Sequence, residues 1–307
     1  MQGFAHEKKR PNLFQSWVLA ARPKTLPAAA APVIVGSAVA FHEGVFRLWP
    51  ALAALLGALL LQIGANFAND VFDFHKGADT HERLGPVRVT QAGLLAPQQV
   101  MAGMWLVFGL AALSGVYLTW QAGWPVAVIG LASILAAIIY TGGPFPIGYY
   151  GLGELFVFLF FGLAAVVGTY FVQAGGAHPL AWWAALPMGF LSAGILVVNN
   201  LRDIETDRRA GKRTVAVRIG AQGTREEYLV CLAGAYLIPV LLWTLGLTSV
   251  WVLLAWLSLP LAYQMGQTIF REKGGALNRA LAGTGRLELI FGLLFSVGLL
   301  IESLLSA

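Results

Sequence analysis

The feature that most constrains this chain is the repeated alternation of long apolar stretches with short polar joints. Each stretch approaches the roughly 20 residues that an α-helix needs to cross the hydrocarbon core of a membrane. We predict nine spans, at 25–42, 47–68, 98–119, 124–141, 151–172, 181–200, 227–247, 249–267 and 286–305. Water is therefore not the main solvent of this chain.

The composition agrees with a membrane protein and excludes an ordinary soluble domain. Hydrophobic residues make up 58% of the 307 residues and charged residues 11%, whereas about a quarter of the residues in soluble domains are charged. The apolar runs lack the alternation of a transmembrane barrel. We therefore predict an all-α, polytopic membrane helical bundle that forms a single domain over 1–307, with 1–16 as a polar segment and no signal peptide.

Basic residues indicate how the spans are oriented. When loops are assigned alternately to the two sides, Arg47 alone falls on one side. Cytoplasmic loops carry an excess of Lys and Arg, so the opposite face and the N-terminus are expected in the cytoplasm of a bacterial plasma membrane. An odd number of spans then places the C-terminus on the far side. The formal net charge of +5 is interpreted as topological, and no nucleic acid partner is expected.

The first cluster of acidic and amide residues follows the second span. If that helix continues, one face carries residues at i, i+3, i+4 and i+7, namely Asn66, Asn69, Asp70 and Asp73. Gly77 suits the end of such a helix.

A second cluster follows the sixth span, where Asn199, Asp203 and Asp207 repeat every four residues. This spacing also predicts one stripe on a helix. By the predicted topology both stripes emerge on the cytoplasmic side, so the chain presents two oxygen-rich helix ends to the same membrane face.

Several carboxylates that converge at a membrane surface repel one another unless a cation lies among them. Asp and Asn oxygens suit Mg²⁺, which binds through one or two carboxylates together with substrate phosphates. The only cysteine, Cys231, lies in a predicted span, and no Cys or His set competes for a softer metal. Metal and cations of this kind would neutralise a leaving diphosphate, and an isoprenoid tail would lie along apolar helices.

These residues resemble the UbiA superfamily of intramembrane prenyltransferases, in which two Asp-rich motifs bind prenyl diphosphate through Mg²⁺. The resemblance extends over about 17–305 and is greatest to the MenA branch, which prenylates 1,4-dihydroxy-2-naphthoate. Its supporting stretches are 21–27, 69–73, 77–80, 84–88, 140–144, 151–154 and 199–220. Phe145 departs from the polar or basic residue expected in many relatives, which leaves the acceptor contacts of that loop open.

The resemblance implies a role for each matching residue. The metal and diphosphate ligands would be Asn69, Asp73, Asp203 and Asp207, supported by Asp70, Asp79 and Asn199. Phosphate or acceptor contacts would come from Arg22, Lys24, Arg88, Arg202, Lys212 and Arg213. The implied reaction joins a polyprenyl group to a ring carbon of the acceptor, with loss of carboxylate and diphosphate, and gives demethylmenaquinone.

Other interpretations stay open for several residues. Arg22 and Lys24 could act as topological anchors, and Glu154 could favour a helix N-terminus instead of binding the acceptor. Tyr140 and Tyr149 could stack on the acceptor or anchor the chain at the membrane interface.

Other functions also stay open. The acceptor could be 4-hydroxybenzoate or homogentisate. A secondary transporter is disfavoured because transporter sites lie near the midplane, whereas nearly all acids here are predicted at one rim. A noncatalytic lipid-binding scaffold is the third class.

Overall fold

The computed structural model describes residues 10–77 and 84–306. Within these ranges the chain forms helices and no strand, as predicted. The α-helices are α1 Leu13–Ala21, α2 Leu26–His42, α3 Leu48–His75, α4 Pro97–Ala122, α5 Trp124–Ile139, α6 Gly153–Val157, α7 Ala165–Ala174, α8 Pro179–Arg209, α9 Val215–Thr244, α10 Leu259–Arg271 and α11 Asn278–Ser306. The tighter or wider helical segments are η1 Pro23–Thr25, η2 Ile147–Tyr149, η3 Phe158–Ala164, η4 Val250–Ser258 and η5 Gly274–Leu277.

Each of the nine predicted spans is occupied by helix. Seven helical stretches of the described residues are long and apolar enough to cross a membrane, and α5 is a shorter apolar helix. The remaining predicted span is formed by η4 and α10. Because α3 and α8 continue to His75 and Arg209, they run past the predicted span ends at 68 and 200 and carry both polar stripes beyond their apolar stretches.

The fifth predicted span is continuous but irregular. It begins as α6, widens into the π-helical turn η3 and continues as α7. A Cβ added to Gly162 of η3 would lie 2.7 Å from the Gly189 Cα of α8. The two backbones therefore touch, which is the close packing that small residues permit between membrane helices.

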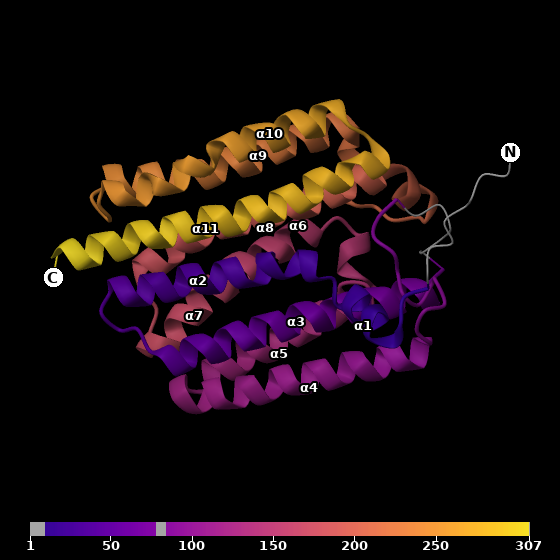
Figure 1. Ribbon diagram of the computed structural model, residues 1–307, viewed down its shortest axis with the longest axis horizontal. Helices are drawn as coiled ribbons and strands as arrows, with labels where there is room; N and C mark the ends of the chain where they lie inside the picture. The colour runs from indigo at the N-terminus through magenta and orange to yellow at the C-terminus, as the bar shows by residue number, and fades with distance from the viewer. Residues whose placement is uncertain (1–9, 78–83, 307) are drawn as a thin grey trace, which may run out of the picture.

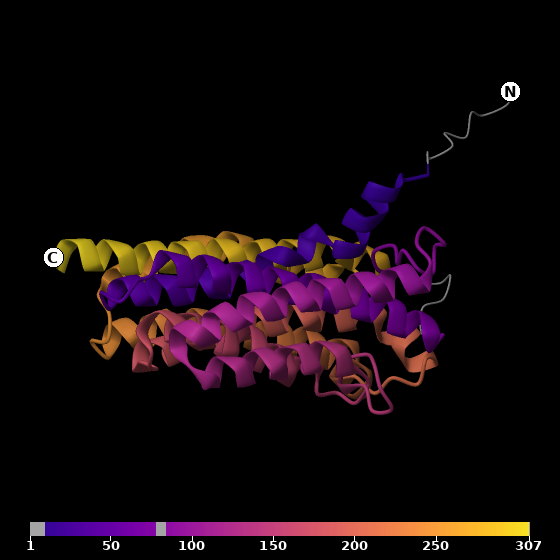
Figure 2. The ribbon, with the colours of Figure 1, turned by 90° about the horizontal axis from the view of Figure 1, so that it is seen from below.

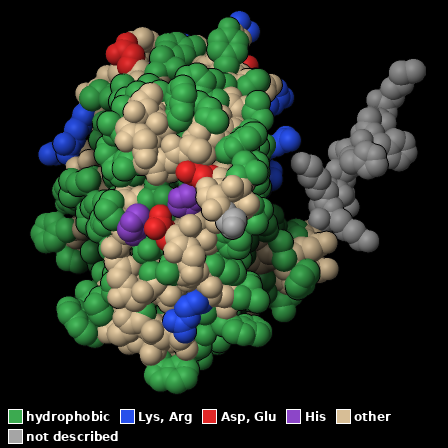
Figure 3. All heavy atoms as spheres, turned by 90° about the vertical axis from the view of Figure 1, so that its left-hand side faces the viewer, with side chains coloured by type: hydrophobic (Ala, Val, Ile, Leu, Met, Phe, Trp, Pro, Cys, Tyr) green, Lys and Arg blue, Asp and Glu red, His purple; other side chains and the backbone are tan. Residues whose placement is uncertain are grey.

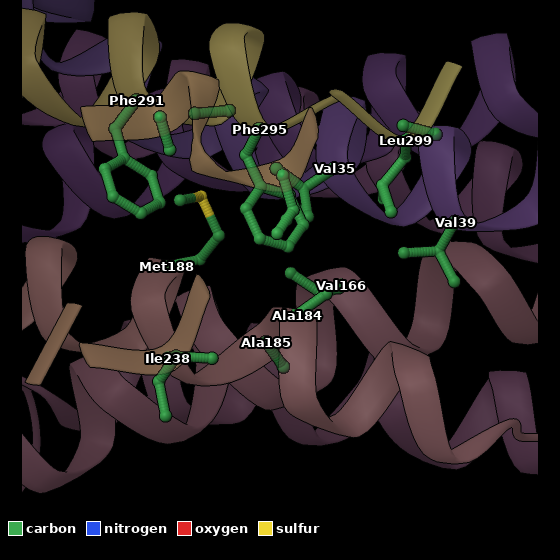
Figure 4. Close-up of a cluster of buried hydrophobic side chains, with 14 of the residues drawn as sticks. Val35, Val39, Val166, Ala184, Ala185, Met188, Ile238, Phe291, Phe295 and Leu299 are labelled. Atoms are coloured by element: carbon green, nitrogen blue, oxygen red, sulfur yellow. The ribbon is translucent and has the colours of Figure 1, made fainter. Parts of the chain in front are cut away.

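The main apolar core lies between α2, α7, α8 and α11. Side chains from these helices and from α9 point toward one another (Figure 4): Val35, Val39, Val166, Ala184, Ala185, Met188, Ile238, Phe291, Phe295 and Leu299. Most of them are fully buried. This core fixes α8 against α11, and both helices extend from it to one end of the bundle.

The long helices run side by side, so that α3 and α8 finish at the end where α11 begins (Figure 1). We call this the aspartate end, because it carries both Asp stripes. The helix α1 lies there and projects away from the bundle (Figure 2), whereas α11 finishes at the opposite end. That far end is largely hydrophobic, with histidines beside acidic side chains (Figure 3). Glu43 lies there within 3.9 Å of His42 and 3.6 Å of His178.

Candidate active site

The first stripe is helical as predicted, since α3 ends at His75 and Gly77 adopts a φ of +65°. Its members nevertheless contact different partners. The Asn66 side chain donates hydrogen bonds to the Ala21 carbonyl at the end of α1 and to the Thr25 hydroxyl of η1, each at 3.0 Å. Asn66 therefore holds α1 and η1 against α3.

Asp70 is buried and holds a loop. One carboxylate oxygen accepts a hydrogen bond from the Val89 amide and the other from the Thr90 amide, each at 3.1 Å. Asp70 is 1% exposed. Both amides belong to residues 84–96, the described part of the α3–α4 loop. Asp70 thus supports the loop that carries Arg88 into the site.

Asp73 lies one turn further along α3 and accepts hydrogen bonds from two side chains outside the helix. Arg88 donates a hydrogen bond to it at 2.9 Å within a buried ion pair, and the Tyr149 hydroxyl donates to its other oxygen at 2.9 Å. Asn69 accepts a hydrogen bond from the Thr141 hydroxyl at 3.0 Å. The first motif therefore meets both the α3–α4 loop and the α5–α6 loop, residues 140–152.

The second stripe is organised by Arg202, whose side chain is 1% exposed. Its Nε donates a hydrogen bond to one Asp203 oxygen at 2.8 Å, and its Nη2 donates to the other. Nη2 also donates to the Asn199 Oδ1 at 2.9 Å. The remaining nitrogen, Nη1, donates to the Asn278 Oδ1 at 2.8 Å. The structure pairs Arg202 with Asp203, and its expected contact with phosphate or acceptor stays a prediction.

Asp207 is paired with Lys212, whose Nζ lies 3.3 Å from its Oδ1. The same ammonium lies 4.6 Å from the centre of the Tyr149 ring. The Arg213 side chain is exposed, and its backbone N–H donates to the Tyr149 carbonyl at 2.7 Å. Tyr149 therefore touches both motifs, because its hydroxyl binds Asp73 while its ring and carbonyl bind residues that follow Asp207.

Lys76 is a residue of this site that the sequence reasoning missed. Its ammonium donates to the Thr141 and Gly143 carbonyls at 2.6 and 3.0 Å and lies 5.2 Å from the centre of the Tyr149 ring. Burial lowers the pKa of Lys76, and the nearby Asp73 partly opposes that shift. Its position three residues after Asp73 was the available signal, because residues i and i+3 lie on one helix face.

Tyr140 and Glu154 lie near the site without joining the ion pairs. Burial raises the pKa of Tyr140, and Glu154, Asp207 and Asp73 add to this effect. Glu154 lies in the first turn of α6, as expected, and its carboxylate accepts a hydrogen bond from the Asn200 amide at 2.7 Å.

The other predicted basic residues lie at the same end of the bundle. Arg22 separates α1 from η1 in a left-handed conformation with a φ of 51°, and Lys24 is exposed in η1. Asp79 lies outside the described residues.

A further acid that the prediction overlooked is Glu288 of α11. It is fully buried and accepts a hydrogen bond from the Ser192 hydroxyl, so the acids are not confined to the rim. An acid within an apolar span was the signal for it.

The donor set suits a hard cation that is shared with a ligand. Among residues 10–77 and 84–306, no three His, Cys, Asp or Glu side chains gather closely enough to hold a metal ion alone. Each Asp oxygen pair instead faces Arg, Lys or backbone N–H groups. Mg²⁺ commonly takes only one or two protein carboxylates and completes its shell with water and phosphate oxygens, so these residues fit a phosphate-bridged ion rather than an all-protein cage.

Fold and site together define an integral membrane protein with an all-helical bundle and a cluster of paired acidic and basic side chains at one end. Two carboxylate-bearing helix ends form that site, and Arg and Lys side chains neutralise them. The model of the UbiA prenyltransferase family matches residues 29–290. The chain belongs to this family.

Relatives cover nearly the whole chain. A 1,4-dihydroxy-2-naphthoate octaprenyltransferase of Escherichia coli is 38% identical over 94% of this chain and 96% of its own length. The enzyme of the same name from Mycobacterium tuberculosis is 42% identical over 91% and 95%. Among solved structures, a UbiA homolog from Archaeoglobus fulgidus bound to GPP and Mg²⁺ has a TM-score of 0.66 at 14% identity and covers 92% of this chain and 99% of its own. That likeness confirms the fold.

Proposed function

We propose that this protein transfers a polyprenyl group from polyprenyl diphosphate to 1,4-dihydroxy-2-naphthoate and gives demethylmenaquinol, the reduced form of demethylmenaquinone. The bond between the prenyl carbon and the diphosphate oxygen breaks, a bond forms to a ring carbon of the acceptor, and the carboxylate leaves as CO₂. The near full-length relatives of that activity support the choice of acceptor. The observation that carries the proposal is the meeting of Asp73 and Asp207 with Tyr149 and Lys212 at one end of the bundle.

The residues present would hold a divalent cation, which we propose to be Mg²⁺. Oxygens of Asn69 and Asp73 on α3 and of Asp203 and Asp207 on α8 are its candidate ligands. When bound, the ion neutralises charge that grows on the diphosphate as the carbon–oxygen bond breaks. An archaeal homolog with the same fold is described as bound to GPP and Mg²⁺, which supports this assignment.

Arg88 and Lys212 have a second task in this proposal. Both are now counter-ions, of Asp73 and Asp207 respectively. A cation on those carboxylates would release the guanidinium and the ammonium toward phosphate oxygens, where Arg can bind two oxygens at once. The site would thus keep its charge balance whether or not substrate is bound.

The membrane setting suits the proposed substrates. The polyprenyl tail partitions into apolar surroundings, while the diphosphate stays at the polar aspartate end. We propose that this end faces the cytoplasm of a bacterial plasma membrane, because the Lys and Arg residues of the loops gather there. The end of α11 would then face the opposite side.

An acceptor assay tests the proposal. The full chain in lipid nanodiscs would receive polyprenyl diphosphate and one of three acceptors: 1,4-dihydroxy-2-naphthoate, 4-hydroxybenzoate or homogentisate. We expect diphosphate, CO₂ and demethylmenaquinol with the naphthoate only, the quinol being detected as demethylmenaquinone after oxidation by air, and loss of product when EDTA removes Mg²⁺. Product from another acceptor would reject the assignment within the family. Flux of substrate into sealed vesicles without product would favour a transporter.

A further inference from the structure

Asn278, the first residue of α11, contacts both halves of the site although neither motif contains it. Its side-chain oxygen accepts the Arg202 Nη1 hydrogen bond at 2.8 Å, across 76 residues of sequence. Its side-chain nitrogen donates to the Leu84 carbonyl at 2.8 Å, across 194 residues. One amide group thereby joins three segments that are remote from each other in the sequence.

The first contact fixes the direction of Arg202. A guanidinium is a rigid plane, so holding Nη1 sets where Nε and Nη2 point. Those two nitrogens hold both oxygens of Asp203, a proposed cation ligand. The Asn278 oxygen therefore acts on Asp203 through the plane of Arg202.

The second contact acts on the other motif. Leu84 lies in the α3–α4 loop, and four residues later the same loop presents Arg88 to Asp73. Fixing Leu84 limits the movement of that loop at the edge of the site. A carboxamide is the side-chain group that supplies both an acceptor for Arg202 and a donor for Leu84.

From these two contacts we propose that Asn278 is a positioning residue for the diphosphate half of the site. It sets the Asp203 carboxylate and the Arg88 loop at the spacing that the metal-bound diphosphate requires. The inference rests on the proposed function, because it assumes that Asp203 and Arg88 serve diphosphate binding. Asn278 itself touches neither substrate.

The test compares Asn278→Ala with Asn278→Asp in the full chain in nanodiscs. Alanine removes both contacts, whereas aspartate keeps an acceptor for Arg202 and loses the donor to Leu84. A hydrogen bond to a charged group accounts for about a tenfold effect or more. We expect Asn278→Ala to raise the KM for prenyl diphosphate and the Mg²⁺ concentration for half-maximal rate about tenfold. The KM for the acceptor should stay within about twofold, and Asn278→Asp should recover most of the loss.

A binding measurement separates this inference from the proposed function. Calorimetric titration of prenyl diphosphate with Mg²⁺ needs no acceptor, and we expect the same tenfold weakening for Asn278→Ala. In a double-mutant cycle, the loss caused by Asn278→Ala should be smaller once Arg202 is replaced by Lys, because only the contact with Leu84 then remains to be removed. Asn12→Ala is the control: Asn12 caps α1 at the same end, so this variant should lower thermal stability and leave diphosphate binding unchanged.

Three outcomes would overturn the inference: unchanged diphosphate binding in Asn278→Ala, an equal rise of both KM values, or additive losses in the cycle. If Asn278→Ala fails to fold, Asn278→Asp provides the test. The inference then requires this variant to bind diphosphate more weakly than wild type and to have the wild-type KM for the acceptor. Wild-type protein that binds prenyl diphosphate but prenylates none of the acceptors would refute the proposed function and leave the binding result for Asn278 intact.

Discussion

Replacing Asp70 by Asn tests whether this residue holds the α3–α4 loop or takes part in the reaction. The Asp70 carboxylate is 1% exposed and accepts two backbone N–H groups, from Val89 and Thr90. Asparagine offers one oxygen to these amides. Its NH₂ group then faces the second amide, so two donors meet in a buried site.

The expected energy follows from that geometry. Hydrogen bonds to a charged group contribute about 1.5–3 kcal/mol each, a neutral one about 1 kcal/mol, and a buried donor without a partner costs about 1–3 kcal/mol. Asp70→Asn should therefore weaken the docking of the α3–α4 loop by about 3 kcal/mol, which is about a hundredfold in its equilibrium. Since that loop carries Arg88, diphosphate binding should weaken.

Steady-state kinetics with prenyl diphosphate as the varied substrate gives the readout. We expect the KM of Asp70→Asn to rise about 10- to 100-fold with kcat within about fivefold of wild type. Asp73→Asn is the matched control: the same chemical change one turn along α3 should lower kcat by about two to three orders of magnitude. A fall in the kcat of Asp70→Asn at unchanged KM would refute the loop-holding role and place Asp70 among the reacting groups.

Three further predictions concern other parts of the molecule. Asp203→Asn should lower kcat by about two to three orders of magnitude, as single-turnover product formation would report, and should also lower the melting temperature because the buried Arg202 loses its charged partner. Because burial lowers the pKa of Lys76 below the ordinary 10.5, the unfolded chain binds more protons just below pH 10.5, so the free energy of unfolding should rise with pH there. Lys76→Met should remove this trend from denaturation profiles. Gly162→Ala should lower the melting temperature because its Cβ would meet the Gly189 backbone at 2.7 Å, whereas Gly109→Ala, with open space around it, should be neutral or slightly stabilising.

The sequence predicts the bundle well because one physical effect dominates its formation. Apolar stretches of membrane length must be helical, since every backbone N–H and C=O in the hydrocarbon needs an internal partner. Local departures from that rule were not predictable. The fifth span widens into η3 where the Gly162 and Gly189 backbones touch, and α9 is kinked at Gly220, whose φ is 75°. The first depends on a contact between two helices, and the second on one glycine with a positive φ; neither is visible in hydropathy.

The two Asp stripes could be predicted, but their partners could not. Helical periodicity places Asn66, Asn69, Asp70 and Asp73 on one face. It does not reveal that they contact three different structures: the α1–η1 segment, the α3–α4 loop and the α5–α6 loop. The partner of each is a loop or turn far along the chain, and the choice depends on how the spans pack. Arg202 shows the same limit: its charge suggested a phosphate contact, and its position beneath Asp203 depends on Asn278 of α11.

Loops, rather than direct contacts between the stripes, hold the two motifs in register. On one side Tyr149 joins Asp73 to the segment after Asp207, and on the other Asn278 joins Arg202 to the α3–α4 loop. Direct pairing of the Asp-rich stripes would place like charges together, which is unfavourable without a cation. Bridging through Tyr, Asn and Arg keeps the carboxylates near one another and neutralised. In the function proposed above, the site would therefore form before metal and diphosphate arrive, with Arg88 and Lys212 already in place beside Asp73 and Asp207.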